Sequence, residues 1–151
     1  MAVEKVKEYF ADKDINIIEL DESSATVDLA AKALNTDPDA IAKTLSYLVN
    51  DQPILVVMAG EARVDNHKYK STFHKKAKMI PFDEVEDYIG HAPGGVCPFA
   101  VKENVKVYLD ESLKRHDVLF PAAGSSNTAV KLTLPELEKY SNPVSWVDVT
   151  K

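Results

Sequence analysis

Apolar residues recur at helical spacing in several segments of the chain. Near the N-terminus, Val3, Val6 and Phe10 follow this spacing and predict a short amphipathic helix. A second helix is expected after Ser24 or Thr26, because either side chain can cap the helix N-terminus. Further helical segments are expected where a capping residue or capping box precedes the pattern: after Asp37, after Asp65, at Asp83–Glu86 and at Thr133–Glu136.

Alternating or continuous apolar runs predict strands between these helices. The segments "KTLSYLV" (43–49) and "PILVVMA" (53–59) are joined by a short connection and predict a hairpin. The second segment is apolar on both faces, so it should be a central strand. Other strands are expected at 15–20, 77–80, 105–110, 117–124 and 128–133. Hairpins and helices mix without regular alternation, which predicts one α+β domain over residues 1–151, with a mixed, barrel-like curled β-sheet flanked by helices.

Composition limits the classes of protein that fit this pattern. The chain has 151 residues, 45% of them hydrophobic and 28% charged, which suits one globular domain with an ordinary core. The longest apolar run, 54–59, is too short to cross a bilayer, and the N-terminus lacks the pattern of a signal peptide. A soluble cytoplasmic protein with no membrane partner is therefore expected. One cysteine and four dispersed histidines give no zinc-binding spacing, so no metal and no cofactor are expected.

Charge is distributed unevenly along the chain. The net charge of −6 argues against simple electrostatic attraction to nucleic acid. Between residues 61 and 80, however, basic residues exceed acidic ones by four. We call Lys70, Lys75 and Lys76 in this segment the lysine patch. It is a candidate for contact with phosphate groups, and the alternative is an ordinary solvated surface.

Two features carry candidate chemistry. Lys43 shares a strand face with Leu45 and Tyr47, so its ammonium must reach solvent, pair with a carboxylate or face a polar cleft. The segment "GHAPGGVCPF" (90–99) concentrates glycine and proline, so its backbone N–H groups can form a rigid anion nest or oxyanion hole. A purely structural turn has the same composition. Cys97 is disfavoured as a nucleophile, because a reactive thiolate needs a base or a cation beside it.

Four segments together resemble the YbaK / prolyl-tRNA synthetase editing-domain family. They are "AKTLSYLV", "PILVVMAGEARVD", "GHAPGGVCPF" and "PAAGSSNTAVKLT", in this order, and the likeness runs from about 26 to 149. The resemblance implies a free-standing, trans-editing aminoacyl-tRNA deacylase that hydrolyses the ester of a mischarged tRNA, such as alanine or another small residue on tRNA-Pro. Two alternatives stay open: a Cys-tRNA-Pro deacylase, although "CPFA" departs from the S-P-I-G of cysteine-specific relatives, and a catalytically silent binding module that uses the same pocket.

The resemblance also implies a site for the 3′ aminoacyl-adenosine end of tRNA. Lys43 falls on the family's K-T-L lysine, which is taken to contact the terminal adenosine or its phosphate. The implied catalytic backbone groups belong to Gly94 and Gly95 of the segment 90–99, which we call the glycine loop. The implied substrate-binding residues are Thr26, Gly90, His91, Pro93, Gly124, Ser125 and Asn127. The lysine patch is then the candidate contact for the phosphates of tRNA, and prolyl-tRNA synthetase or an elongation factor is the expected protein partner. The hypothesis requires the Lys43 ammonium and the glycine loop to converge on one hollow.

Overall fold

A six-stranded mixed sheet forms the centre of the molecule. The computed structural model describes residues 2–21 and 26–151. The strands are β1 (Ile17–Glu19), β2 (Ile41–Val49), β3 (Gln52–Ala59), β4 (Lys106–Asp110), β5 (Val118–Pro121), β6 (Thr128–Val130), β7 (Leu132–Thr133) and β8 (Ser145–Val147). The order in the large sheet is β7-β5-β2-β3-β4-β8, and β1 and β6 form a separate antiparallel pair.

The hairpin of β2 and β3 is the longest pairing in the sheet. Its turn residues Asn50 and Asp51 both have positive φ, 50° and 66°, as the tight turns that match strand twist require. From Pro53 to Ala59, β3 is buried throughout, because β2 and β4 flank its edges and its two faces pack into two different core clusters. The prediction of a hairpin with a central second strand is therefore confirmed.

The sheet curls at its β5 end. β5 pairs in parallel with β2 and antiparallel with β7, and an isolated bridge between Ala122 and Ala129 links the chain after β5 to β6. The small β1–β6 sheet thus folds over the end of the large one. The predicted α+β class with a curled mixed sheet is confirmed.

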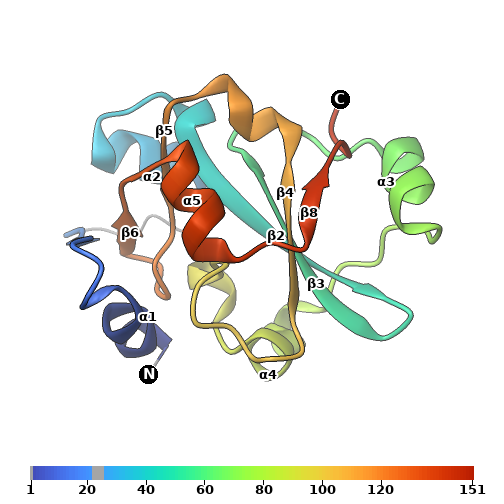
Figure 1. Cartoon of the computed structure of the whole chain (residues 1–151), viewed down its shortest axis with the longest axis horizontal. Helices are drawn as coiled ribbons and strands as arrows, with labels where there is room; N and C mark the ends of the chain where they lie inside the picture. The colour runs from blue at the N-terminus through green and yellow to red at the C-terminus, as the bar shows by residue number, and fades with distance from the viewer. Residues whose placement is uncertain (1, 22–25) are drawn as a thin grey trace.

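Helices cover both faces of the sheet. They are α1 (Ala2–Phe10), α2 (Val27–Leu34), α3 (Asn66–Phe73), α4 (Val85–Ile89) and α5 (Leu134–Ser141), with short 3-10 turns at 38–40, 82–84, 93–95 and 111–115. α1, α4 and α5 supply apolar side chains to the main core on one face of the sheet. α3 packs through Tyr69 on the other face, and α2 packs through Ala30 and Ala31 against Ile41. Figure 1 shows α2 near one end of the longest axis and α3 at the opposite end.

Capping chemistry fixes several helix ends as expected. Thr26 caps α2, since its side chain accepts a hydrogen bond from the Leu29 N–H at 3.2 Å; Ser24 lies outside the described residues. The Thr133–Glu136 capping box forms with both of its hydrogen bonds. The Asp83–Glu86 box is wrong, because α4 continues directly from a 3-10 turn and its N-terminus has no side-chain cap.

Two predicted strands differ in the structure. The segment 128–133 divides into β6, which pairs with β1, and β7, which pairs with β5. The segment 77–80 forms only an isolated bridge, between Met79 and Tyr47 of β2. Across residues 2–21 and 26–151, no helix has both the length and the apolar character needed to span a membrane.

Candidate active site

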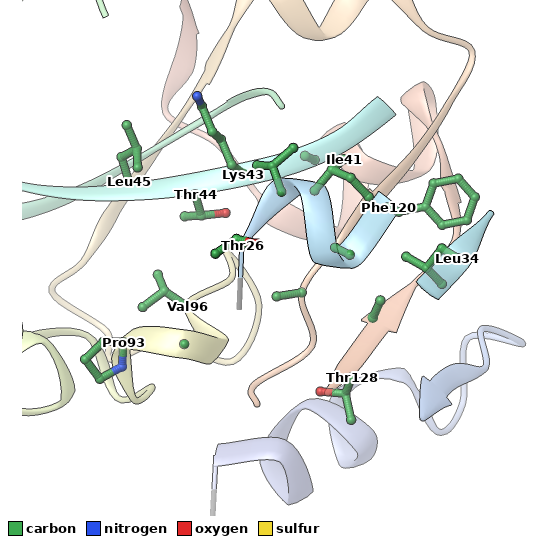
Figure 2. A pocket seen from close by; sticks show the side chains of 16 residues that line it. Thr26, Leu34, Ile41, Lys43, Thr44, Leu45, Pro93, Val96, Phe120 and Thr128 are labelled. Atoms are coloured by element: carbon green, nitrogen blue, oxygen red, sulfur yellow. The ribbon is translucent and has the colours of Figure 1, made fainter. Parts of the chain in front are cut away.

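A cavity of about 280 Å³ lies between α2, the first half of β2, the glycine loop, the end of β5 and β6. Its lining is mostly apolar, and its apolar members include Ala30, Leu34, Ile41, Ala42, Phe120, Ala122 and Ala129. Figure 2 shows these elements around the cavity. The threonines Thr26, Thr44 and Thr128 are polar members of the lining, and Pro93 belongs to the turn of the glycine loop. We call this space the acyl cavity.

Four of the predicted site residues line the acyl cavity: Thr26, Lys43, Pro93 and Gly94. Pro93 starts the 3-10 turn of the glycine loop, and Gly94 is the exposed residue within that turn. Within the described residues the Gly94 N–H makes no hydrogen bond to the protein, so it is available to a ligand. The glycine loop therefore reaches the cavity through Gly94.

Gly95 has a different role from the one predicted. Its N–H donates to the Ala92 carbonyl at 2.9 Å, and its own carbonyl accepts from the Gly124 N–H at 3.2 Å. A Cβ placed on Gly95 would lie 2.3 Å from the backbone nitrogen of Ser125. Gly95 thus allows two loops to touch backbone to backbone, and its amide is not free to bind an oxyanion.

Gly90 and His91, at the start of the glycine loop, do not line the acyl cavity. Gly90 ends α4 with a φ of 102°, which only glycine adopts without strain. His91 is fully buried, and its Nε2 donates to the Phe99 carbonyl at 2.7 Å. Burial lowers the pKa of His91. Gly90 and His91 therefore stabilise the conformation of the glycine loop without lining the cavity.

Residues 124–127 form the turn that supports the other wall. Ser125 Oγ donates to Asn127 Oδ1 and lies within hydrogen-bond distance of Thr128 Oγ1, both at 2.8 Å. Asn127 Nδ2 donates to the Leu20 carbonyl, which attaches this turn to the end of β1. Gly124, Ser125 and Asn127 do not line the acyl cavity, whereas Thr128, which the sequence analysis did not single out, does.

The Lys43 ammonium lies on the far side of β2 from the glycine loop. Figure 2 shows Lys43 and Leu45 on one side of the strand, and Thr44 and Pro93, the first residue of the 93–95 turn, on the other. Its Nζ donates to the Ala62 carbonyl at 2.5 Å. The expected convergence of this ammonium with the loop on one hollow is not present, because neighbouring side chains of a strand point to opposite faces.

A polar hollow receives the Lys43 ammonium instead. It is lined by Val27, Asp28, Lys43, Gly60, Glu61 and Arg63, and it meets the acyl cavity at Val27 and Lys43. Burial, together with the nearby Arg63 charge, lowers the pKa of Lys43, while the Asp39 carboxylate acts in the opposite direction. The hollow thus holds two cations, Lys43 and Arg63, together with the carboxylates of Asp28 and Glu61. Its cationic groups are the ones that can bind a phosphate group.

Thr44 is the side chain that β2 turns into the acyl cavity. Its Oγ1 is buried and has no hydrogen-bond partner within the described part of the chain. A buried hydroxyl without a partner costs about 1–3 kcal/mol, and a bound ligand can supply the missing partner. Strand alternation was a sufficient signal to find it, since Thr44 must face opposite to Lys43.

Cys97 does come close to a histidine. Its Sγ lies 3.5 Å from His91 Nε2, yet the thiol is fully buried, and burial raises its pKa to about 12. The thiol therefore stays protonated at neutral pH and lies outside the acyl cavity. A thiol-based hydrolase has no support in this geometry.

The lysine patch lies apart from the acyl cavity. Lys70 is in α3, and Lys75 and Lys76 follow the end of that helix; all three are exposed. Because α3 and α2 lie towards opposite ends of the molecule, a tRNA that fills the cavity must extend along the protein to reach the patch (Figure 1). Contact between the patch and tRNA stays a prediction.

Comparison with known proteins now decides the family. A family model described as an aminoacyl-tRNA editing domain matches residues 21–140. The chain belongs to this editing-domain family. YwhH of Bacillus subtilis is 43% identical over 154 residues, which cover 100% of this chain and 98% of YwhH. EbsC of Enterococcus faecalis, a candidate Cys-tRNA(Pro)/Cys-tRNA(Cys) deacylase, is 26% identical over 113 residues, which cover 74% of this chain and 69% of EbsC.

Synthetases and a solved structure extend the comparison. A proline–tRNA ligase of Aquifex aeolicus is 30% identical over 90 residues, which are 58% of this chain but only 16% of the ligase. A crystal structure described as a candidate trans-editing enzyme for prolyl-tRNA synthetase matches with a TM-score of 0.88 and 23% identity, covering 99% of this chain and 97% of that one. The latter likeness establishes the fold.

Membership of the editing-domain family gives the class of reaction. Editing hydrolyses the ester between an amino acid and the 3′ end of tRNA, so this editing domain is an aminoacyl-tRNA deacylase and aminoacyl-tRNA is its class of substrate. The resemblance inferred from the sequence motifs is confirmed.

Proposed function

We propose that this deacylase removes a small amino acid, alanine foremost, from mischarged tRNA-Pro. The observation that carries the proposal is the size and character of the acyl cavity. Its volume of about 280 Å³ is at the lower limit of ordinary ligand pockets, and several of its walls are alanine side chains. Such a space suits a small uncharged side chain better than a long or charged one.

Cysteine is the second candidate for the edited amino acid. Its side chain is nearly as small as that of alanine, and the name of EbsC refers to cysteine. The segment 97–100, where the sequence departs from cysteine-specific relatives, does not line the acyl cavity. That departure therefore does not bear directly on specificity, and the choice depends on the lining residues.

The geometry suggests how the ester is held. With the amino acid in the acyl cavity, the Gly94 N–H and the Thr44 hydroxyl, both without a partner among the described residues, are the proposed donors to the ester carbonyl and to the oxyanion formed from it. The polar hollow beside Val27 is then the place for the phosphate of the terminal nucleotide, facing Lys43 and Arg63. Lys43 acts in this arrangement by binding the substrate.

Proton transfer is assigned to the substrate itself. Among the described residues that line the acyl cavity, Lys43 is the only ionisable one, and its ammonium faces away. A hydroxyl of the ribose or the amino group of the amino acid is therefore the proposed acceptor of the proton from the attacking water. Positioning of the water and stabilisation of the oxyanion remain the contribution of the protein.

A panel of mischarged tRNAs tests this proposal. Alanyl-, cysteinyl- and prolyl-tRNA-Pro are incubated with the protein, and loss of the ester is compared with a buffer blank. We expect alanyl-tRNA-Pro to be hydrolysed fastest and prolyl-tRNA-Pro to survive. Faster hydrolysis of the cysteinyl ester would show that cysteine, and not alanine, is the preferred amino acid. Absence of turnover on every member would instead favour a silent binding module.

The variant Thr44→Val sharpens the test. It keeps the shape of the side chain and removes the unpaired hydroxyl, so we expect kcat on the preferred ester to fall about 10- to 100-fold. Thr36→Val, in the turn that follows α2, is the matched control outside the cavity and should have no effect. Equal rates for Thr44→Val and the wild type would remove Thr44 from the mechanism.

A protein partner that delivers tRNA is a further part of the proposal. The net charge of −6 favours weak intrinsic affinity for tRNA. Prolyl-tRNA synthetase or an elongation factor could supply the missing affinity, and addition of either protein to the panel assay should then lower KM for the tRNA.

A further inference from the structure

A second groove opens directly beside the acyl cavity. It has a volume of about 390 Å³ and shares Thr44, Leu45, Pro93 and Val96 with that cavity. Its outer rim consists of Met79 and Phe82, from the segment between α3 and α4. We call it the aromatic groove. A ligand whose one end fills the acyl cavity can therefore continue into this groove without leaving the protein surface.

The rim of the aromatic groove exposes apolar surface to an unusual degree. Phe82 is 79% exposed and Met79 is 55% exposed. They are two of the four large apolar side chains that are exposed in the described part of the chain. Apolar side chains gathered at the rim of a groove are typical of ligand or partner sites.

The chemistry of the lining restricts the occupant. Within residues 2–21 and 26–151, no charged side chain lines the aromatic groove, and the side-chain hydroxyls that do so belong to Thr44 and Ser46. A phosphate, a carboxylate or an ammonium would find no counter-charge there. A flat, uncharged group with a few hydrogen-bonding atoms on its edge fits both the apolar rim and the hydroxyls.

We infer that the aromatic groove binds the terminal adenine base of the tRNA substrate, stacked on Phe82 beside Met79. The inference rests on the proposed placing of the amino acid in the acyl cavity. In a 3′ ester, the acyl group, the base and the phosphate leave the same ribose in different directions. The aromatic groove adjoins the cavity at Thr44 and Leu45, whereas the polar hollow adjoins it at Val27 and Lys43. Base and phosphate thus have separate sites on either side of the acyl group.

Stacking explains why an exposed phenylalanine is useful here. Unpaired bases at the ends of RNA are commonly held on aromatic side chains, and such a contact contributes enough to change affinity about 5- to 150-fold. Most of the Phe82 side chain is exposed at the groove, so a base can reach its ring without displacing core residues. The groove therefore recognises the end of the tRNA rather than its identity.

Two measurements on Phe82→Ala test the inference. The first is kcat/KM on the preferred aminoacyl-tRNA, which should fall about 5- to 150-fold, mainly through KM. The second is binding of 3′-alanylamido-adenosine, a stable amide, compared with the same amide on a ribose without a base. Phe82→Ala should weaken binding of the adenosine compound and leave binding of the baseless compound unchanged. Phe82→Trp should preserve both, since tryptophan stacks as well.

Val144→Ala is the matched control, because Val144 is 58% exposed and lies outside the groove. It should leave both measurements unchanged, and thermal unfolding checks that each variant is folded. Equal loss of the two amides in Phe82→Ala would assign Phe82 to the acyl cavity and overturn the inference. The inference would also be overturned if Phe82→Ala had the same kcat/KM and the same amide binding as the wild type. A loss of kcat/KM that occurs only when a synthetase is present would overturn it in favour of a protein-docking surface. Absence of turnover in the wild type would refute the proposed function, while the binding comparison would still decide where the base lies.

Discussion

Removal of the Lys43 charge separates substrate binding from chemistry. The ammonium lies on the side of β2 away from the glycine loop and faces the polar hollow with Arg63. We therefore expect Lys43→Met, which keeps an unbranched apolar stem, to raise KM for aminoacyl-tRNA while kcat changes little. A side chain that acts only on the phosphate stabilises the ground state and the transition state alike.

The expected size follows from the contact that is lost. A hydrogen bond to a charged group contributes about 1.5–3 kcal/mol, which corresponds to a change of about 10- to 150-fold in KM. Because the hollow is open to solvent, the lower part of this range applies. The slope of log affinity against log salt should also fall by about 0.7, the value for one phosphate contact on a single strand.

The assay is steady-state deacylation at several salt concentrations and pH values. Because the pKa of Lys43 is lowered below 10.5, KM should begin to rise with pH earlier than for an ordinary lysine, as the ammonium loses its proton. Lys43→Arg should keep KM independent of pH in that range, since arginine stays charged. Lys32→Met, which removes an exposed charge from α2, is the control. A fall in kcat of a hundredfold or more with KM unchanged would show that the ammonium acts in the transition state.

Three further predictions concern the loops and the surface. Gly95→Ala should destabilise the fold by about 1–3 kcal/mol in urea unfolding, since its Cβ would lie 2.3 Å from the Ser125 nitrogen; an unchanged midpoint would contradict the close packing. Cys97, with its pKa raised to about 12, should resist iodoacetamide at pH 8 until urea unfolds the protein, and stability should decline as pH rises from 9.0 towards 12, because the unfolded thiol ionises first; prompt labelling of folded protein would argue against this. Reversing the three charges of the lysine patch to glutamate should weaken tRNA binding and flatten its salt dependence, and an unaltered slope would identify the patch as solvated surface.

Local rules predicted most of the elements in this chain. The hairpin of β2 and β3 followed from two apolar runs and a short turn, and the ends of α2 and α5 followed from Thr26 and Thr133. The 128–133 segment could not be divided from its pattern alone, because its first half pairs with β1 and its second half with β5. Partners so distant in the chain leave no local signal.

The sequence motifs indicated which residues lie at the site better than they indicated the direction in which each side chain points. The motifs predicted that Lys43, Pro93 and Gly94 serve one site; all three line the acyl cavity, but the Lys43 ammonium faces the polar hollow. The functions assigned to the side chains needed the strand alternation as well, which turns Lys43 outwards and Thr44 inwards. Gly95 could not be distinguished from Gly94 by sequence, because the difference depends on the turn that packs against it.

The close contact at Gly95 limits how amino-acid preference can be re-engineered within the family. Two stretches, 90–99 and 122–128, meet backbone to backbone there, so neither has room to shift independently. In a chimera that receives one of these stretches from a homologue, that stretch would not fit the stretch retained from this chain. Transplanting both stretches together should preserve the walls of the acyl cavity, and natural divergence at this point should proceed by paired changes.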